Sequence, residues 1–582
     1  MNVFKDVENR DDLFERLGIS KQLATYLLYG KGIDNCYSTF VIEKRNGDPR
    51  VINAPNKELK SVQKRLVNAI LLQRSCNNQN GKSLKIAHAF EKNKSIITNA
   101  KVHRNKRFVL NVDLEDFFTS FHFGRVRGFF ENDNTFKVPR KVATVIAQLT
   151  CYKGVLPQGA PSSPIITNLI CRIMDLRILK LSKKFNLNYT RYADDLCFST
   201  NDQKFLLDEQ VFLSKLTREI CKAGFKINSK KTRLQFRDSR QKVTGLVVNR
   251  KLNVPREFYK NTRAMANKLY ANSEFTIDGK KGSIDQLEGR FAFINQIDRW
   301  NNSLELEQSI TSNMLNYQKL LLRSKYQNKE IFGRLNARER EYQKFLYYKY
   351  FYGNDKPIVV TEGKTDILYI KAALKNLYQS YPDLVERIGN DYKFKVSFFK
   401  KSKNNKEIPR IKYFLNIPQD GADSMKNLYS FFSDKNSCYP NYLDYFQKKY
   451  SSKPLNPVIF IFDNEIENNK KPARNFVNHI KIRGALSELR DKQRLRIIGN
   501  LYMIVTPLVN SLKETDIESL FSSQTLGHKI DGKSFNRNGG KEYYGKGIFA
   551  QYVSKNYENI DFTNFKPLLD NLNKVIIDYK DG

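Results

Sequence analysis

The sequence predicts two unlike folds in one chain: an α+β module, followed by an α/β module with a mainly parallel sheet. The first prediction comes from three acids at the ends of apolar strands, Asp113 after one strand and Asp194-Asp195 at the tip of a hairpin. The second comes from strands that alternate with helices beyond residue 356. A chain of 582 residues is too long for a single core, so several domains are expected.

The three acids are the strongest chemical signal. An apolar run over 107–113 ends in Asp113, and a hairpin over 187–199 carries Asp194 and Asp195. Such carboxylates repel one another unless divalent cations neutralise them, and a pair of Mg²⁺ ions is what in-line phosphoryl transfer requires. The cluster indicates a nucleotidyl transferase, whereas an isolated Asp-Asp pair is more typical of a solvated turn.

Motifs on either side of Asp113 favour a nucleotide-binding pocket. Two extended runs joined at Asn46-Gly47 predict a hairpin, on which Lys44 and Arg50 can grip a triphosphate. Phe118, five residues after Asp113, would stand where a 2′-hydroxyl would go, so it favours deoxynucleotides.

Two later segments add to this pocket. In Leu156–Pro164, Gln158 can touch the incoming nucleotide and Gly159 lets the backbone lie close to a base pair; a helix follows over 165–181. Lys230 lies in a basic segment whose lysines can protonate the leaving pyrophosphate.

Taken in order from Phe40 to Asn249, these motifs resemble those of reverse transcriptases. Two further segments resemble signatures of the retron enzymes: Asn99-Ala100-Lys101-Val102-His103, and Val243-Thr244-Gly245. The resemblance implies RNA binding by Asn99, His103, Val243, Thr244 and Gly245. For His103 taken alone, a core or capping histidine is the alternative.

The resemblance also implies the architecture and the partners. A right-hand polymerase would have an N-terminal helical region over 1–30, fingers and palm over 31–250, and a helical thumb that binds RNA over 251–352. It would use two Mg²⁺ ions and deoxynucleotides. A dedicated structured noncoding RNA would serve as primer and template, and synthesis from an internal 2′-hydroxyl would give branched RNA-DNA (msDNA). A group II intron or diversity-generating reverse transcriptase, or an RNA-binding scaffold, is the alternative.

Composition agrees with a nucleic-acid partner. The formal net charge is +40 and the pI is near 9.7, a strong bias toward a polyanion. A basic membrane-surface protein would explain the charge as well, but no apolar run near 18 residues and no long basic amphipathic helix is present in the sequence. The first residues lack a secretory pattern, so we expect a cytoplasmic protein without a membrane partner.

The region 356–582 predicts a second site at the carboxyl edge of a parallel sheet. A buried strand ends at Thr361 and is followed by Glu362, and another ends at Phe462 and is followed by Asp463-Asn464-Glu465. A third strand, Leu501–Val505, precedes a further pair of acids, Asp516 and Glu518. The alternative is a structural domain with ordinary acids at its strand ends.

This region resembles a Toprim domain, the fold of topoisomerases, primases and overcoming-lysogenization-defect nucleases. Glu362-Gly363-Lys364-Thr365-Asp366 matches its glutamate motif, and Asp463-Asn464-Glu465 matches its Asp-x-Asp motif except that glutamate replaces the last aspartate. The resemblance implies that Glu362 and Lys546 are catalytic residues. It also implies that one or two Mg²⁺ ions are bound by a set of five acids: Glu362, Asp463, Glu465, Asp516 and Glu518. It implies a nuclease that acts on DNA or RNA, and it implies that the fusion serves in antiphage defence. Whether the protein forms a homo-oligomer is left open.

Overall fold

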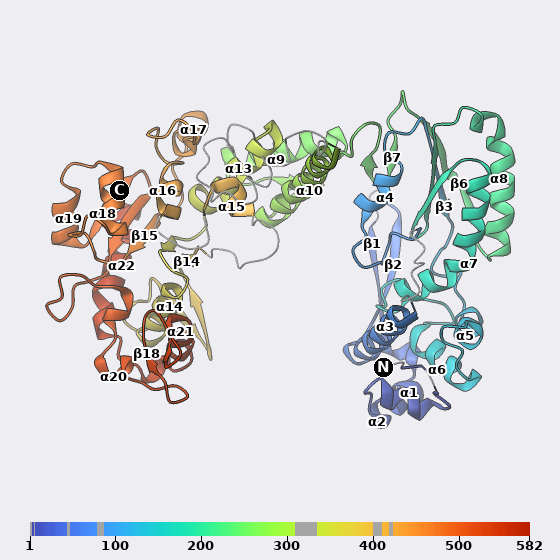
Figure 1. Cartoon of the computed structure of the whole chain (residues 1–582), viewed down its shortest axis with the longest axis horizontal. Coiled ribbons are helices and arrows are strands. Elements are labelled where there is room, and N and C mark those ends of the chain that lie inside the picture. The colour runs from blue at the N-terminus through green and yellow to red at the C-terminus, as the bar shows by residue number, and fades with distance from the viewer. Residues whose placement is uncertain are drawn as a thin grey trace. The chain divides into compact units, whose positions relative to one another are not determined.

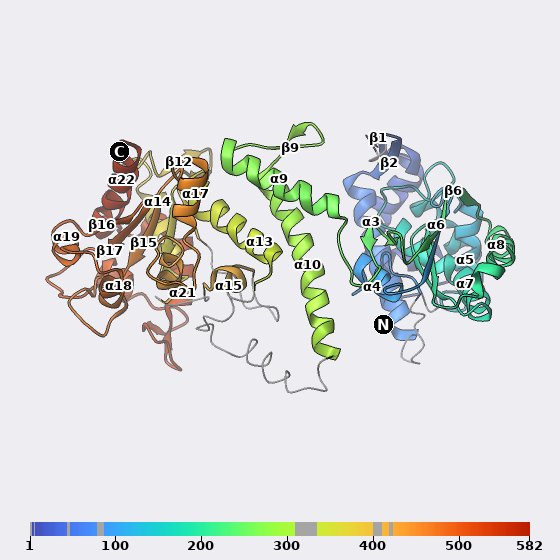
Figure 2. The ribbon, with the colours of Figure 1, turned by 90° about the horizontal axis from the view of Figure 1, so that it is seen from above.

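The computed structural model describes residues 3–4, 6–43, 47–77, 86–308, 335–399, 410–417 and 423–581. These residues pack as two compact units, Met1–Arg256 and Glu257–Gly582 (Figure 1 and Figure 2). None of the described helices combines the length and the apolar character needed to cross a membrane.

The first unit combines helices with three small sheets. Its helices are α1 (Arg10–Arg16), α2 (Lys21–Thr25), η1 (Tyr26–Gly30), η2 (Ile33–Cys36), α3 (Lys57–Asn77), α4 (Ile96–Val102), α5 (Phe123–Asn132), α6 (Arg140–Thr150), α7 (Ser163–Lys184) and α8 (Phe205–Lys222). Its strands are β1 (Tyr37–Glu43), β2 (Pro49–Pro55), β3 (Phe108–Leu114), β4 (Asn188–Tyr192), β5 (Asp195–Thr200), β6 (Ile227–Phe236), β7 (Lys242–Val243) and β8 (Leu246–Val247).

Several local predictions are confirmed in this unit. Strands β1 and β2 form the antiparallel hairpin expected around Asn46-Gly47, and β4 and β5 form the hairpin that precedes and follows the Asp194 turn. The predicted apolar helix is α7, which begins with proline in its first turn and buries Ile166 and Ile178. Each of these elements is specified by a pattern within a few neighbouring residues, which explains why the sequence predicted it.

The largest sheet of the first unit has the strand order β4-β5-β3-β6, and all its pairings are antiparallel. Because it lies in the region predicted as fingers and palm, we call it the palm sheet. Because successive side chains on a strand point to opposite faces, the sheet separates two environments. Tyr189 and Phe198 stack on each other, and the Phe198 ring contacts Phe212 of α8, so this face is covered by α7 and α8. Thr190 and Ser199 point to the opposite face, where they contact the end of α4.

The second unit carries the rest of the chain. Its helices are α9 (Arg256–Asn272), α10 (Ile284–Gln308), α13 (Ala337–Tyr347), η5 (Tyr348–Tyr352), α14 (Asp366–Asn376), α15 (Arg410–Leu415), α16 (Asp423–Tyr429), α17 (Tyr442–Tyr450), α18 (Pro472–Ile480), α19 (Ala485–Lys492), η6 (Ile517–Leu520), α20 (Ser523–Leu526), α21 (Lys546–Lys555), η7 (Tyr557–Asn559), η8 (Thr563–Phe565) and α22 (Lys566–Asp581). Its strands are β9 (Thr276–Ile277), β10 (Lys280–Lys281), β11 (Ile358–Thr361), β12 (Val385–Ile388), β13 (Asp391–Phe394), β14 (Ser397–Phe398), β15 (Val458–Phe462), β16 (Arg494–Ile498), β17 (Leu501–Val505), β18 (Ser534–Phe535) and β19 (Tyr543–Tyr544).

The main sheet of the second unit has the order β14-β11-β15-β17-β16. Its pairings are parallel except that of β16 with β17. Both faces are buried: Phe460 and Met503 belong to one core, while Ile459 and Ile504 belong to another that includes α14, α21 and α22 (Figure 1). A central sheet with helical layers on both faces therefore presents the carboxyl ends of β11, β15 and β17 at one edge.

The helices expected to form a thumb pack with the α/β region that follows them. Phe291 of α10 and Phe345 of α13 lie in the same core as β11 and β15, and the ring of Tyr270 in α9 contacts Phe446 of α17 at 5.0 Å. Residues 309–334 of the expected thumb lie outside the described part of the chain. Packing divides the described chain after Arg256. This division does not test the functions expected of the four regions 1–30, 31–250, 251–352 and 356–582, which stay predictions.

Candidate functional site

The structure brings Asp113, Asp194 and Asp195 together at one end of the palm sheet. Asp113 on β3 lies directly opposite Asp195 on β5 in the antiparallel ladder, so both side chains share the face away from α7 and α8. Asp194 sits in the turn between β4 and β5, and its carbonyl accepts a hydrogen bond from the Leu114 amide at 3.1 Å. The preceding residue, Ala193, has φ of 59°, a left-handed conformation that turns the chain sharply before the acids.

The electrostatics of these acids follow from their closeness. Burial, together with the charges of Asp194 and Asp113, raises the pKa of Asp195 to about 7. Burial and the charge of Asp113 also raise the pKa of Asp194. The Nζ atom of Lys231 lies 3.0 Å from Asp113 Oδ1, and this hydrogen bond raises the lysine pKa. Lys231, not the predicted Lys230, is therefore the lysine that faces the acids.

The donor chemistry at this end of the sheet suits Mg²⁺. The three carboxylates supply only oxygen donors, and the pKa values of Asp194 and Asp195, raised by burial and by neighbouring acids, reflect a local excess of negative charge. As the side chains stand, no group of three or more His, Cys, Asp or Glu residues in the described ranges is arranged around a common metal position.

The β1–β2 hairpin contributes to the predicted nucleotide pocket. The positive charge of Arg50 on β2 partly offsets the rise in the pKa of Asp194, so the guanidinium group acts on the end of the sheet that carries the three acids. The amide of Asn53, also on β2, donates a hydrogen bond of 2.7 Å to the carbonyl of Gln158. Lys44 lies outside the described residues.

Gly159 occupies a position that only glycine fits. Its φ is +127°, and a Cβ atom there would lie 2.7 Å from the carbonyl oxygen of Asn53. The absent side chain therefore allows the loop after Leu156 to lie directly against β2. Phe118 is half-buried. The centroid of its ring lies 5.5 Å from that of Phe117 and 6.5 Å from that of Phe90, and these contacts fix the orientation of the ring.

A buried ion pair behind the acids was missed by sequence reasoning. Arg191 on β4 is fully buried and donates hydrogen bonds from Nε and Nη2 to Asp175 on α7, at 2.9 to 3.2 Å. Its Nη1 donates to the carbonyl of Ala193 and to Asn168 Oδ1, each at 3.2 Å. The signal in the sequence was an arginine inside a predicted strand, since arginine is rarely buried without a partner.

The predicted RNA-binding residues divide into buried and exposed ones, and this corrects part of that prediction. Asn99, His103 and Val243 are fully buried. His103 is the C-cap of α4, and its ring nitrogens hydrogen-bond to Ser199 at 2.8 Å and Thr190 at 2.7 Å. Burial lowers its pKa to about 3. Because their side chains are enclosed, these residues shape the palm rather than face RNA, and the capping alternative describes His103.

The Val-Thr-Gly segment forms the turn of the β7–β8 hairpin. Val243 pairs with Leu246, and Thr244 and Gly245 both have positive φ values, 45° and 83°, the geometry of a type I′ turn. Thr244 Oγ1 donates to the carbonyl of Ile96 at 3.4 Å, which links this hairpin to α4. The structure thus joins the two retron-like segments, 99–103 and 243–245, and leaves Gly245 exposed.

In the second unit, acids from two other chain segments, 362–366 and 516–518, act on Asp463, which follows β15. Burial raises its pKa well above the usual value, and the charges of Glu362, Asp366, Asp516 and Glu518 add to that effect. A reciprocal pair of backbone hydrogen bonds between Asn464 and Thr515, at 2.8 and 3.1 Å, holds the loops after β15 and β17 together. The Asp463 carboxylate also accepts from the Ile517 amide at 3.2 Å.

Two basic side chains neutralise part of this acid group. Arg537 donates from Nη2 to Asp516 at 2.8 Å, and although burial raises the Asp516 pKa, the hydrogen bonds from Arg537 and Ser519 leave it lowered. Lys546, at the start of α21, donates to Glu518 at 2.9 Å. Burial raises the pKa of Glu518 despite this contact.

The second site also corrects the predicted set in detail. Asp366 belongs to the group, with its carboxylate accepting from the Gly363 amide at 2.8 Å, and it was absent from the predicted ligands although it ends the glutamate motif. Arg537 had no sequence signal. Glu465, a predicted ligand, instead forms an ion pair of 2.6 Å with Lys471.

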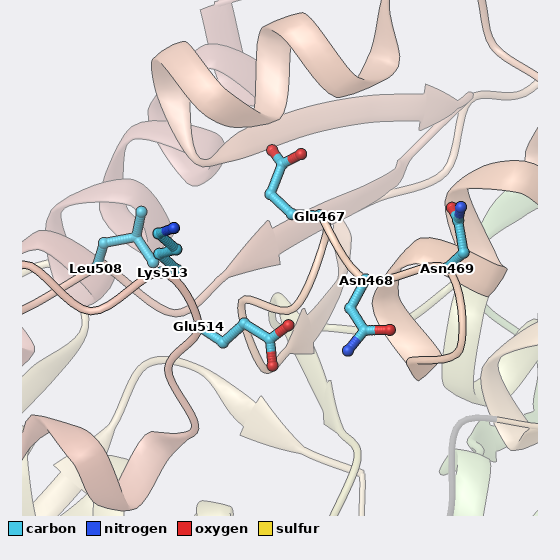
Figure 3. A pocket seen from close by; sticks show the side chains of 6 residues that line it. All are labelled: Glu467, Asn468, Asn469, Leu508, Lys513 and Glu514. Carbon is cyan, nitrogen blue, oxygen red and sulfur yellow. The ribbon is translucent and has the colours of Figure 1, made fainter.

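A hollow of about 570 Å³ lies beside the same sheet edge. Figure 3 shows its lining, in which three residues come from the segment after β15 and three from the segment after β17: Glu467, Asn468, Asn469, Leu508, Lys513 and Glu514. Glu467 is engaged by Arg490 at 2.7 and 2.9 Å. None of the predicted ligands lines this hollow.

The chain is similar to known proteins over its first part. A family model described as reverse transcriptase (RNA-dependent DNA polymerase) matches residues 42–249. The Retron Ec86 reverse transcriptase of Escherichia coli is 36% identical over 295 residues, which cover 50% of this chain and 85% of that protein. The Retron Mx162 reverse transcriptase of Myxococcus xanthus is 32% identical, covering 51% of this chain and 65% of that protein.

Among solved structures, a truncated apo telomerase from Candida tropicalis is 16% identical, with a TM-score of 0.28, covering 38% of this chain and 55% of that chain.

Proposed function

The chain belongs to the family of retron reverse transcriptases, and from that membership we propose that it copies a dedicated structured noncoding RNA into DNA that remains branched to the RNA. As a reverse transcriptase it is an RNA-directed DNA polymerase. The observation that carries the proposal is the convergence of Asp113, Asp194 and Asp195 at one end of the palm sheet.

Reverse transcriptases generally use Mg²⁺, and the three aspartates would hold two such ions, which activate an attacking sugar hydroxyl and stabilise the charge on the leaving pyrophosphate. The remaining work falls to side chains around the acids. Arg50 binds the triphosphate with its planar guanidinium group, assisted by Lys44. Lys231, already beside Asp113, donates a proton to the departing pyrophosphate.

Selection of the nucleotide depends on Phe118 and Gly159. The ring of Phe118, held by contacts with Phe117 and Phe90, would stand where a 2′-hydroxyl on the incoming sugar would go. At Gly159 the backbone approaches β2 closely enough that the loop and the hairpin form one wall of the pocket. Gln158 is fixed in that wall through its carbonyl, which the Asn53 amide holds.

RNA binding is favoured by the net charge of +40, because each neutralised phosphate releases condensed counterions. If synthesis begins at an internal 2′-hydroxyl of the bound RNA, the product is the branched RNA-DNA (msDNA). The proposal extends to this priming step because the chain carries both retron-like segments, 99–103 and 243–245.

For the second unit we propose a Toprim nuclease that acts on DNA or RNA. Glu362 and Lys546 would transfer protons, while the carboxylates of Asp463, Asp516, Glu518 and Asp366 supply oxygen donors that suit one or two Mg²⁺ ions. Glu465 would join them only by leaving Lys471. The raised pKa values of Asp463 and Glu518 support this assignment, since buried acids that repel one another favour a bound cation.

The proposed biological role is antiphage defence, in which the branched RNA-DNA restrains the nuclease until infection disturbs it. This role rests on the joining of a retron polymerase to a nuclease-like unit in one chain.

The nucleic acid that copurifies with the protein provides the test. We expect one RNA species joined to DNA, in which the junction resists ribonuclease and is released by a debranching enzyme. Asp194→Asn should copurify with the same RNA without DNA, because the acid is lost while the basic surfaces remain. A mixed pool of cellular RNA would contradict the retron function, and linear DNA extended from an RNA 3′ end would indicate another mode of priming.

A further inference from the structure

A hollow of about 530 Å³ lies at the end of the palm sheet opposite the catalytic acids. It is lined by the start of β3, the loop after β5, the end of β6 and the segment after β8: Arg107, Phe108, Gln203, Phe236, Arg237, Asp238 and Arg250. Phe108 and Asp113 are at opposite ends of β3, which separates the hollow from the acids by about 17 Å at 3.3 Å per residue. It is therefore separate from the polymerase centre.

The hollow combines positive charge with an exposed aromatic ring. Arg107, Arg237 and Arg250 are exposed, and within the described part of the chain no salt bridge engages their guanidinium groups. The ring of Phe236 is 44% exposed, and its edge packs against the buried ring of Phe108 at 5.8 Å and 87°, which holds it in place. Arginine forks beside an accessible aromatic face are the elements that bind phosphate and stack on a base.

The backbone of this region is fixed in advance by polar contacts. The Arg237 amide donates to the carbonyl of Arg107 at 2.9 Å, which joins the turn after β6 to the start of β3. The side-chain amide of Asn249 donates to the carbonyls of Arg237 and Ser239 at 2.9 and 2.6 Å. The turn that presents Arg237 is therefore held in one conformation, which lowers the entropy lost when a ligand binds.

We propose that this hollow binds one unpaired ribonucleotide of the structured RNA, with the base stacked on Phe236 and the flanking phosphates held by Arg107, Arg237 and Arg250. This proposal rests on the proposed function, because it takes the noncoding RNA as partner. The volume suits one nucleotide, since pockets for small ligands span about 300 to 1,000 Å³.

The lining also favours RNA over a free anion. Asp238 and Gln203 offer a carboxylate and an amide, which hydrogen-bond to a 2′-hydroxyl or a base edge, whereas a site for phosphate alone gains nothing from a carboxylate. The hollow lies next to both retron-like segments in sequence: Arg107 follows His103 by four residues, and Arg250 follows Gly245 by five. A nucleotide here would anchor the body of the RNA while its priming end reaches the acids.

The test uses the full-length protein and an in vitro transcript of the RNA that copurifies with it, in filter binding across a range of salt concentrations. Phe236→Ala should weaken binding by about 5- to 150-fold, because stacking on one base contributes about 1–3 kcal/mol. Phe236→Trp should retain it. Arg237→Ala should lower the slope of log affinity against log salt by about 0.9 for each phosphate that the variant no longer neutralises.

Arg218→Ala, which removes an exposed arginine on α8, is the matched control and should bind as the parent does. In 2′-hydroxyl acylation of the bound RNA, one nucleotide protected by the parent should become reactive with Phe236→Ala. Parent-like affinity, salt slope and acylation in Phe236→Ala and Arg237→Ala would overturn the site while leaving the proposed function intact. A parent that binds no defined RNA would overturn both.

Discussion

Arg191 and Asp175 form a fully buried ion pair, with Nη2 of the arginine 2.9 Å from Oδ2 of the aspartate, directly behind the turn that carries the catalytic acids. The same guanidinium group donates to the carbonyl of Ala193, the left-handed residue before Asp194. Burial alone would lower the arginine pKa, but the Asp175 charge raises it, so the guanidinium group stays charged. One side chain therefore ties α7 to the catalytic turn.

Arg191→Lys should impair DNA synthesis while retaining the positive charge. Lysine lacks the planar fork, so it cannot hold Asp175 and the Ala193 carbonyl together. We expect synthesis to fall by about 10- to 100-fold, because small displacements of catalytic groups have effects of that size. The free energy of unfolding should decrease by up to about 3 kcal/mol, as for a damaged buried pair.

Primer extension and urea unfolding measure these two effects. Arg177→Lys, at an exposed position of α7, the helix that carries Asp175, is the control and should match the parent. Parent-like extension rates by Arg191→Lys would show that the guanidinium group does not position the catalytic turn.

Gly159→Ala should raise the KM for deoxynucleotides. The added Cβ would lie 2.7 Å from the Asn53 carbonyl oxygen, so the loop and β2 must separate. Gly154→Ala is the matched control: Gly154 also has positive φ, 80°, but nothing lies within 4 Å of its Cβ position. Both variants carry backbone strain of about 1–3 kcal/mol, so only the clash distinguishes them.

Steady-state kinetics with one deoxynucleotide varied give the comparison. A rise in KM of about tenfold or more, equivalent to about 1.4 kcal/mol, is expected for Gly159→Ala beyond that of Gly154→Ala. Equal KM values for the two variants would mean that the loop does not form part of the pocket.

Because of His103, the free energy of unfolding should decrease as the pH falls from 7.5 to 5. Its folded pKa, about 3, lies below the usual value of 6.5, so in this interval the unfolded chain binds a proton that the folded chain does not. The stabilisation is complete above about pH 6.5 and is lost progressively below it, by on the order of 2 kcal/mol at pH 5.

The measurement is the free energy of unfolding of the parent and of His103→Asn at both pH values. The difference between pH 7.5 and pH 5 should be smaller in His103→Asn, which has no titrating group at this position. An identical difference in the two proteins would show that the buried imidazole does not titrate as its environment requires.

Glu362→Gln should separate the two activities. The substitution preserves size and hydrogen bonding but removes the charge that acts on Asp463, so branched DNA synthesis should persist while nuclease activity and phage protection are lost. Glu465→Asp should retain nuclease activity, because Glu465 is engaged by Lys471 rather than by the acid group.

Glu467→Gln is the control, since Glu467 lies on the same segment as Glu465 but pairs with Arg490 at the surface. Plasmid and RNA cleavage with Mg²⁺, together with phage plating, are the readouts. Full phage protection by Glu362→Gln would argue against a Toprim nuclease and in favour of a structural role for the second unit.

Local sequence signals determined much of this protein. The β1–β2 and β4–β5 hairpins, the helix α7 and the strand-end acids were predictable because turn chemistry and apolar periodicity act over a few residues. The order of the motifs also indicated the family that the relatives support.

Tertiary structure alone decided which side chains meet across long sequence separations. Lys231 rather than Lys230 faces Asp113, because strand pairing and its irregularity near Asp113 determine which lysine reaches the acids. His103 is enclosed because Thr190 and Ser199 point toward α4. Arg191 contacts Asp175 only because β4 packs on α7. Arg537 contacts Asp516 only because the fold brings these two residues, 21 positions apart in the sequence, together. No short segment of the sequence predicts such contacts, since the burial of side chains and their pairing arise from the packing of the whole unit.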